Sequence, residues 1–224
     1  MKRTVYLLSK RLFDIICSVI GIIITSPIWL IAIIGIELSD YGPVFYIARR
    51  VGRHNKEFRM YKFRSMRIET NANEYGFKAD VDRIFPFGWF MRNSKIDELP
   101  QLINILLGNM SIVGPRPASI DQVKTVRMGK YEISANVTSG LTGPSALYDY
   151  IYGDTIDNEL EYKEKVLPTR LELDAWYVKH MTPWLDIKMI LYTVVCVCTS
   201  ILNKKQEKIL NEIIEYIESE DDMV

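Results

Sequence analysis

The feature that most constrains this chain is an uncharged, strongly apolar run from Ile15 to Ile36. At ~1.5 Å of rise per residue, a straight helix over this run would be about 33 Å long, close to the thickness of a bilayer core. A signal peptide would have a shorter apolar stretch and a cleavage site with small residues, whereas Glu37, Ser39 and Asp40 follow this run. A helix buried in a water-soluble protein rarely stays uncharged over such a length. The run therefore predicts a membrane anchor.

Positive charge flanks the apolar run on both sides. Because basic side chains next to membrane segments stay on the cytoplasmic side, a straight span would place one basic flank outside. Ser26-Pro27 lies at mid-run, where proline kinks or breaks a helix and where the Thr25 and Ser26 hydroxyls can bond the carbonyls that it frees. We predict a re-entrant hairpin with a break at Ser26 and Pro27; a spanning helix with a proline kink is the alternative. The flanking cations are Lys2, Arg3, Lys10 and Arg11 before the run, and Arg49, Arg50, Arg53, Lys56, Arg59, Lys62, Arg64 and Arg67 after it.

The charges balance in number but not in position. Lys plus Arg and Asp plus Glu each total 28, but the residues before Thr70 are mainly basic and the last part of the chain carries a run of acids. Basic segments beside a membrane attract anionic headgroups, at about 1 kcal/mol per Lys or Arg near the surface. We therefore expect inner-membrane lipids, and not nucleic acid, as the partner of these cations. The 3 Cys and 2 His lack the spacing of a zinc site and fit a reducing, cytoplasmic setting.

Short-range patterns predict a β-hairpin followed by helices. A turn signal at 39–43 precedes a short strand at 44–47, and the apolar–polar alternation over 58–63 is typical of its partner strand. Ser94 is the expected cap of a helix that has Asp97 in its first turn, Pro100 soon after, and apolar side chains on one face until Gly108. Further helices are expected at 119–132, 158–181, 184–202 and 204–220.

These elements predict an α+β, mainly helical fold in three parts. Residues 1–40 form the re-entrant membrane anchor. Residues 41–202 form a cytosolic and interfacial catalytic domain, in which the uncharged stretch 189–202 is short for a span and is expected to lie in the interface or buried. Residues 203–224 form an amphipathic, acidic tail that we expect to dock on the domain or on a partner.

The neighbouring carboxylates Asp97 and Glu98 are the main candidates for chemistry. Such a pair can be a surface acid pair, can hold Mg²⁺, or can supply a nucleophile. The positive end of a helix favours the carboxylate form and also favours a bound phosphate. Composition alone leaves the three interpretations open.

Four cations are candidates for binding phosphate: Lys62, Arg64, Arg92 and Arg116. Arg116 lies between two prolines that pre-set its backbone, and its guanidinium can bind phosphate through two parallel hydrogen bonds or can instead cap a loop. Lys62 and Arg64 alternate with Phe63 and so share a strand face, which can equally be a solvated basic surface. A membrane-bound chain with two adjacent carboxylates and several cations suggests phosphoryl chemistry on an amphipathic substrate.

Several motifs resemble those of the bacterial sugar transferase family, the monotopic polyprenyl-phosphate phosphoglycosyl transferases of the small, single-domain type. The resemblance covers about residues 10 to 200, and its most specific strings are Asp97-Glu98-Leu99-Pro100-Gln101 and Gly114-Pro115-Arg116-Pro117. Other matching strings are Lys10-Arg11 with Asp14, Ser26-Pro27, Gly42-Pro43-Val44-Phe45-Tyr46, Tyr61-Lys62-Phe63-Arg64-Ser65-Met66, Gly108-Asn109-Met110-Ser111, Gly140-Leu141-Thr142-Gly143 and Trp184-Leu185-Asp186.

The resemblance implies an enzyme that moves a phosphosugar from a UDP-sugar to undecaprenyl phosphate and releases UMP. Asp97 would attack the β-phosphate and carry the phosphosugar covalently, and Glu98 would assist by deprotonating the acceptor or supporting Mg²⁺. Mg²⁺ would be the cofactor, held by Asp97 with Glu98 as a further ligand. Lys62, Arg64, Arg92 and Arg116 would neutralise phosphates, as phosphoryl transfer requires.

This family places the chain on the cytoplasmic face of the inner membrane, with both termini in the cytoplasm. It would catalyse the first membrane step of capsule, O-antigen, exopolysaccharide or glycoprotein assembly. Its partners would be the two substrates and membrane lipids, with a homodimer or a downstream glycosyltransferase as further partners. The alternative is a non-catalytic membrane adaptor on the same fold, which would have no need of Asp97, Glu98, Arg92 and Arg116.

Overall fold

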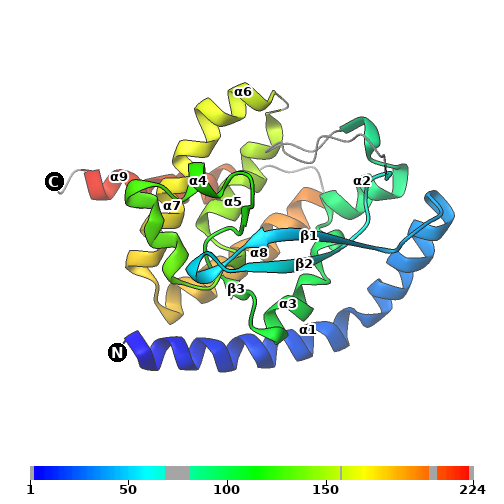
Figure 1. Cartoon of the computed structure of the whole chain (residues 1–224), viewed down its shortest axis with the longest axis horizontal. Coiled ribbons are helices and arrows are strands. Elements are labelled where there is room, and N and C mark those ends of the chain that lie inside the picture. Colours follow the sequence, from blue (N-terminus) through cyan, green and yellow to red (C-terminus); the bar gives the residue numbers. More distant parts are fainter. Residues whose placement is uncertain (1–2, 69–80, 157, 202–205, 222–224) are drawn as a thin grey trace.

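The computed structural model describes residues 3–68, 81–156, 158–201 and 206–221. A long N-terminal helix runs along one side of a mostly helical domain that contains a small sheet (Figure 1). The main helices are α1 (Arg3–Ser39), α2 (Pro86–Asn93), α3 (Gln101–Leu107), α5 (Pro144–Ile151), α7 (Leu167–His180), α8 (Pro183–Ile201) and α9 (Glu207–Asp221), with short helices α4 (Val123–Val126) and α6 (Glu159–Glu161). The strands are β1 (Phe45–Val51), β2 (Glu57–Phe63), β3 (Ser111–Val113), β4 (Ala118–Ser119) and β5 (Gly140–Thr142).

Helix α1 is continuous through Pro27, so the predicted helix break is wrong. Pro27 lacks the N–H that would bond the carbonyl of Ile23, and the Ser26 hydroxyl donates to that carbonyl instead, at 2.8 Å. The Thr25 hydroxyl likewise donates to the Gly21 carbonyl, at 2.7 Å. As expected from the sequence, these hydroxyls donate hydrogen bonds to backbone carbonyls, but they maintain the helix and do not end it. The helix changes direction along its length (Figure 1). The path of α1 relative to a bilayer stays a prediction.

Both halves of α1 are fixed to the same domain. Near the N-terminus, the Lys10 ammonium lies 2.7 Å from the Asp186 carboxylate at the start of α8, and the Asp14 carboxylate accepts a 3.0 Å hydrogen bond from the backbone N–H of Ile112. Near its C-terminal end, Ala32 and Ile36 are buried in a cluster with Phe63, Phe85 and Met91. Contacts near both ends of α1 therefore hold the helix along the domain.

The predicted hairpin is confirmed, with longer strands than expected. Strands β1 and β2 pair antiparallel, with Phe45 opposite Phe63 and Val51 opposite Glu57. Strand β4 adds to the free edge of β1, and β3 pairs in parallel with β5 in a second, two-stranded sheet. The sequence predicted neither of these additions, because strands this short carry no readable alternation.

The larger hydrophobic core lies among α5, α7, α8 and α9. The amphipathic tail docks on this core, which is one of the two positions expected for it. Ile209 and Ile213 are buried, and the Trp176 ring of α7 stacks on Tyr216 of α9 at 4.5 Å. The helix expected at 119–132 is wrong, since only α4 and a 3₁₀ segment at Gly129–Asn136 form there. The predicted domain boundary at 202/203 lies outside the described residues.

Within the residues that the structure describes, two helices, α1 and α8, are long and apolar enough to cross a membrane. Both expose large apolar side chains, including Ile23, Ile24 and Leu30 on α1 and Leu191 and Val194 on α8. Exposed apolar surface of this extent marks contact with lipid or another protein. The interfacial position expected for α8 stays a prediction.

Candidate active site

The acidic pair lies in a tight turn before α3 and not in the first turn of that helix. Lys95 adopts the left-handed conformation (φ 57°), the 3₁₀ turn η3 (Ile96–Glu98) follows, and α3 begins only after Pro100. Ser94 ends α2, where its hydroxyl donates to the Phe90 carbonyl at 2.7 Å, so its predicted role as an N-cap is wrong. The turn points consecutive carboxylates into different surroundings.

Asp97 is buried, with 5% of its surface exposed. Within the described part of the chain, its Oδ1 atom is inaccessible and has no hydrogen-bond partner. Burial raises the pKa of Asp97, and so does Glu98, whereas Lys62, Lys95 and Arg92 favour the charged form. A buried carboxylate oxygen without a partner costs free energy, and native proteins keep few of them outside functional sites.

The pKa of Glu98 is lowered, in contrast to that of Asp97. Its carboxylate lies 2.8 Å from the Lys62 ammonium of β2. Burial alone would raise the pKa of Glu98, but Lys62, Lys95 and Arg116 together lower it to about 2. Glu98 is therefore ionised at neutral pH and is a poor proton acceptor.

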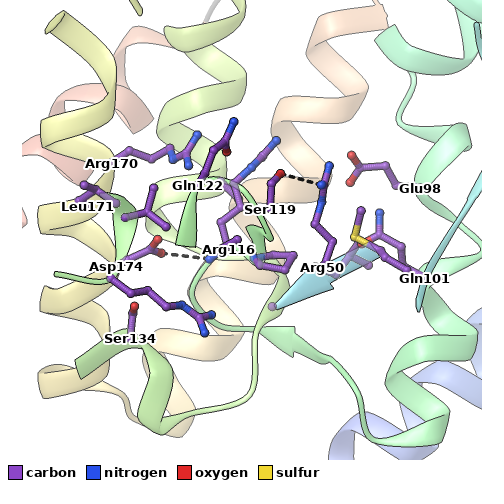
Figure 2. Close-up of a pocket in the computed structure, with 18 of the residues that line it drawn as sticks. Arg50, Glu98, Gln101, Arg116, Ser119, Gln122, Ser134, Arg170, Leu171 and Asp174 are labelled. Atoms are coloured by element: carbon purple, nitrogen blue, oxygen red, sulfur yellow. Dashed lines mark hydrogen bonds between the residues drawn. The ribbon is translucent and has the colours of Figure 1, made fainter. Parts of the chain in front are cut away.

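Arg116 reaches the pair from the loop between β3 and β4. One guanidinium nitrogen lies 3.2 Å from the Asp149 carboxylate of α5, and its backbone N–H donates to Asp174 of α7 at 3.2 Å (Figure 2). Asp149 is held in turn by Arg170 and by a 2.5 Å hydrogen bond from the Tyr162 hydroxyl. The Arg116 side chain stays 42% exposed, so one face of a firmly held guanidinium is open to a ligand.

The remaining predicted cations divide into two groups. Arg92 acts on Asp97 through its charge, and its guanidinium touches the Met66 sulfur at 3.7 Å. Arg64 is held at the end of α1, where it pairs with the Asp40 carboxylate and donates to the Pro43 carbonyl at 2.6 Å. Lys62, Arg92 and Arg116 thus act electrostatically on the acidic pair, whereas the Arg64 donors already bond the α1–β1 junction.

The sequence interpretation did not single out Lys95, Asp149, Arg170 or Asp174. Lys95 stands two residues before Asp97, and this proximity was the one local signal that could have identified it. The other three come from α5 and α7, and only tertiary folding brings them to Arg116. Burial raises the pKa of Asp174 to about 6, although the Ser145 hydroxyl bonds it at 2.5 Å.

Two pockets meet at Glu98 and Arg116. The first is polar and lies between β1, the Arg116 loop and α7; its lining includes Arg50, Lys62, Gln101, Gln122, Arg127 and Arg170 (Figure 2). The second lies between η3, α5 and α8; its walls combine aliphatic side chains such as Leu99, Leu147 and Val197 with charged ones. Glu98, Arg116, Leu141 and Ala146 line both.

The residues present fit a Mg²⁺ site that is completed by substrate. In the part of the chain that the structure describes, no three His, Cys, Asp or Glu side chains cluster as a ready-made metal cage. Mg²⁺ at phosphate-transfer sites is commonly bound by one or two carboxylates together with substrate phosphates. The Asp97 carboxylate and the ionised Glu98 would be the protein ligands of such an ion.

Comparison with known proteins identifies relatives. A UDP-glucose:undecaprenyl-phosphate glucose-1-phosphate transferase of Klebsiella pneumoniae is 36% identical over 190 residues, covering 83% of this chain and 39% of the relative. A UDP-N-acetylgalactosamine-undecaprenyl-phosphate N-acetylgalactosaminephosphotransferase of Aeromonas hydrophila is 33% identical over 199 residues, covering 87% of this chain and 45% of the relative. An uncharacterized sugar transferase of Bacillus subtilis is 36% identical over 185 residues, covering 83% and 85%.

The chain thus spans less than half the length of the first two relatives. The model of the family described as "Bacterial sugar transferase" matches residues 5–200, which include α1, the acidic pair, the Arg116 loop and α8. This chain belongs to the bacterial sugar transferase family.

Proposed function

We propose that this protein transfers a sugar 1-phosphate from a UDP-sugar to undecaprenyl phosphate, releasing UMP. The names of the Klebsiella and Aeromonas relatives support this reaction class. The observation that carries the proposal is the buried Asp97, whose unpartnered oxygen adjoins an ionised Glu98 within a group of cations. The product would begin the assembly of a cell-surface glycoconjugate on its lipid carrier.

In the first half-reaction, Asp97 Oδ1 attacks the β-phosphorus of the UDP-sugar. The bond from this phosphorus to the bridging oxygen breaks, UMP leaves with that oxygen, and the phosphosugar stays on Asp97 as an acyl phosphate. Lys62, Arg92 and Arg116 stabilise the charge that spreads over the phosphoryl oxygens. Within the described residues, Oδ1 has no hydrogen bond to break, but it is buried, so the attack requires the site to open around this atom when substrate binds.

In the second half-reaction, a phosphate oxygen of the polyprenyl acceptor attacks the same phosphorus. The bond to Asp97 breaks, the carboxylate is regenerated, and the diphosphate-linked lipid sugar leaves. The lowered pKa of Glu98 makes it a weak base, which favours a charge-holding role over deprotonation of the acceptor. Glu98 fixes Lys62 at 2.8 Å and keeps this cation beside the phosphoryl group.

Mg²⁺ would bind Asp97, with Glu98 as a further ligand, and would neutralise phosphate charge. The polar pocket suits the nucleotide, because its lining offers amides and guanidinium groups. Among these, the Gln122 Nε2 atom is buried without a hydrogen-bond partner in the described residues and can donate to a ligand.

A one-sided membrane topology accords with this function. The Lys10–Asp186 pair and the cluster around Ile36 hold opposite ends of α1 on one domain. A bilayer-spanning α1 would pull that domain through the hydrocarbon region, where exposed loops and charges are costly. We therefore propose that α1 is re-entrant and that both termini and the site face the cytoplasm, where UDP-sugars are available.

The test is UMP release by purified protein in nanodiscs containing polyprenyl phosphate, with a panel of UDP-sugars. Asp97→Asn keeps the size of the side chain but removes its anionic oxygen, so UMP release should fall by several orders of magnitude, roughly the range seen when a catalytic nucleophile is removed. A non-catalytic adaptor would release no UMP from any UDP-sugar. Full turnover by the Asn variant would refute the nucleophile.

A further inference from the structure

The second pocket connects the acidic pair to an apolar helix. One wall is the inner face of α8, where Thr193 and Val197 line the pocket. The adjoining face of α8 exposes Leu191, Val194 and Val195, and α8 is long and apolar enough to cross a membrane. The remaining apolar walls come from Leu99, Leu141, Ala146 and Leu147. The pocket therefore joins the reaction centre to a surface suited to lipid.

The opposite end of this pocket carries two cations, Lys95 and Arg116, together with three carboxylates, Glu98, Asp149 and Asp154. The Lys95 ammonium lies 4.1 Å from the centre of the Tyr150 ring and 3.5 Å from the Asp154 carboxylate. Arg116 stands beside it with part of its guanidinium exposed. These two cations make that end suitable for a phosphate.

The carboxylates in this pocket are each paired with a cation. Asp154 faces Lys95, Asp149 faces Arg116, and Glu98 faces Lys62. Asp154 is 55% exposed, so water screens its repulsion of an incoming anion. The charges thus permit a phosphate between Lys95 and Arg116.

The polar pocket on the other side of Glu98 and Arg116 has a different character. Its amides and guanidinium groups suit a water-soluble nucleotide and would not hold a hydrocarbon chain. Because the two pockets share this wall, two substrates can approach Glu98 and Arg116, next to Asp97, from different directions. A ping-pong reaction needs such access for a donor from water and an acceptor from lipid.

We propose that the pocket between η3 and α8 binds the acceptor: the phosphate lies between Lys95 and Arg116, and the first isoprene units lie along Leu99, Leu147 and Val197. The occupant is a phosphate monoester of a long apolar alcohol, since Lys95 and Arg116 at one end can bind its phosphate and Leu99, Leu147 and Val197 offer apolar surface to its chain. This inference rests on the proposed function. It assigns Lys95 to the second substrate specifically.

The test separates the two half-reactions. Val197→Trp fills the wall of the pocket, and Val194→Trp makes the same change on the exposed face of α8 as the matched control. Exchange of labelled UMP into UDP-sugar, which needs no acceptor, reports the first half-reaction. For Val197→Trp we expect this exchange to stay within about twofold while the KM for undecaprenyl phosphate rises on the order of tenfold, equivalent to about 1.4 kcal/mol. The control should change neither.

Lys95→Gln is the second variant, in case the tryptophan disturbs folding. It should raise the acceptor KM and weaken the dependence of that KM on salt, since a screened charge contact is lost. Unchanged acceptor KM in both variants, with exchange still running, would overturn the site assignment. Displacement of the acceptor by equal amounts of phosphatidylglycerol would also overturn it, by revealing a general anionic-lipid site. Absence of exchange in the unmodified protein with every UDP-sugar would instead refute the proposed function, and the site with it.

Discussion

Replacing Asp149 by Asn tests how the Arg116 guanidinium is held. The Asp149 carboxylate lies 3.2 Å from Arg116 and 3.7 Å from Arg170, and its side chain is 8% exposed. Asparagine keeps the volume and can still accept the hydrogen bond from Tyr162, but it removes the charge that both arginines face. Arg170, of whose side chain only 10% is exposed, then keeps its contact with the Tyr162 hydroxyl and the charge of Asp174 but loses that of Asp149.

The expected loss of stability follows from these exposures. Removing one partner of a fully buried ion pair costs about 3–5 kcal/mol, but Arg116 is 42% exposed and screened by water. We therefore expect the free energy of unfolding to fall by about 2–3 kcal/mol, which is below the full range because only Arg170 is nearly buried. For a chain of this size, such a loss lowers Tm by roughly 4–12 °C. UMP release should also slow, because Arg116 is no longer fixed.

The assay is thermal unfolding in one detergent, followed by tryptophan fluorescence. Arg116 and Arg170 lower the pKa of Asp149 against the effect of burial, which alone would raise it. The folded pKa is thus below the unfolded value, so the stabilisation is fully present above that value and is lost as the pH falls through the folded pKa. The Tm difference between the two proteins should be constant from pH 7 to about 5 and should narrow below the ordinary carboxylate pKa of 3.8.

Glu161→Gln is the matched control, because Glu161 pairs with Lys165 on an exposed helix surface. Its effect should stay below about 0.5 kcal/mol. An unchanged Tm in Asp149→Asn, or a loss no larger than that of the control, would refute the reasoning that Asp149 holds the two arginines.

Three further predictions concern the phosphate contact, the anchor and the tail. Arg116→Lys keeps the charge but loses the planar guanidinium, so kcat/KM for UMP release should fall by an amount equivalent to about 1–3 kcal/mol; unchanged kinetics would return Arg116 to a loop-capping role. In a cysteine-free background, Thr4→Cys and Tyr41→Cys should both resist an impermeant thiol reagent in intact cells, and labelling of position 4 alone would indicate a spanning helix. Ile213→Ala should lower the unfolding free energy by about 2–4 kcal/mol, since Ile213 is 0% exposed on the face of α9 that packs on the domain; a change under about 0.5 kcal/mol would show that the tail does not pack on the domain.

Local patterns predicted those elements whose residues specify their own structure. The alternation at 58–63 predicted β2, and the amphipathic spacing after Gln206 predicted α9. Of the helix expected at 119–132, only Val123–Val126 forms: Arg127 already leaves the helical conformation, and Gly129 then has a left-handed φ of 57°. Pro27 was misread because the Ser26 hydroxyl replaces the missing donor and allows α1 to continue.

The site was predicted where its residues are close in sequence and missed where they are not. Asp97, Glu98 and Arg116 stand in recognisable strings, but the turn that separates the surroundings of the two carboxylates depends on the left-handed Lys95. Arg64 was grouped with Lys62 because both alternate along a strand, yet β2 ends at Phe63 and Arg64 turns to Asp40. Asp149 depends on tertiary contacts between α5 and the Arg116 loop, for which no sequence periodicity exists.

The central claim is that Asp97 is the nucleophile, and intact-protein mass spectrometry tests it most directly. Protein incubated with its UDP-sugar, without polyprenyl phosphate, should gain the mass of one phosphosugar, and peptide mapping should locate the adduct on Asp97. Addition of undecaprenyl phosphate should remove the adduct, and Asp97→Asn should not acquire it. An adduct on another residue, or full turnover without any adduct in rapid-quench samples, would contradict the account.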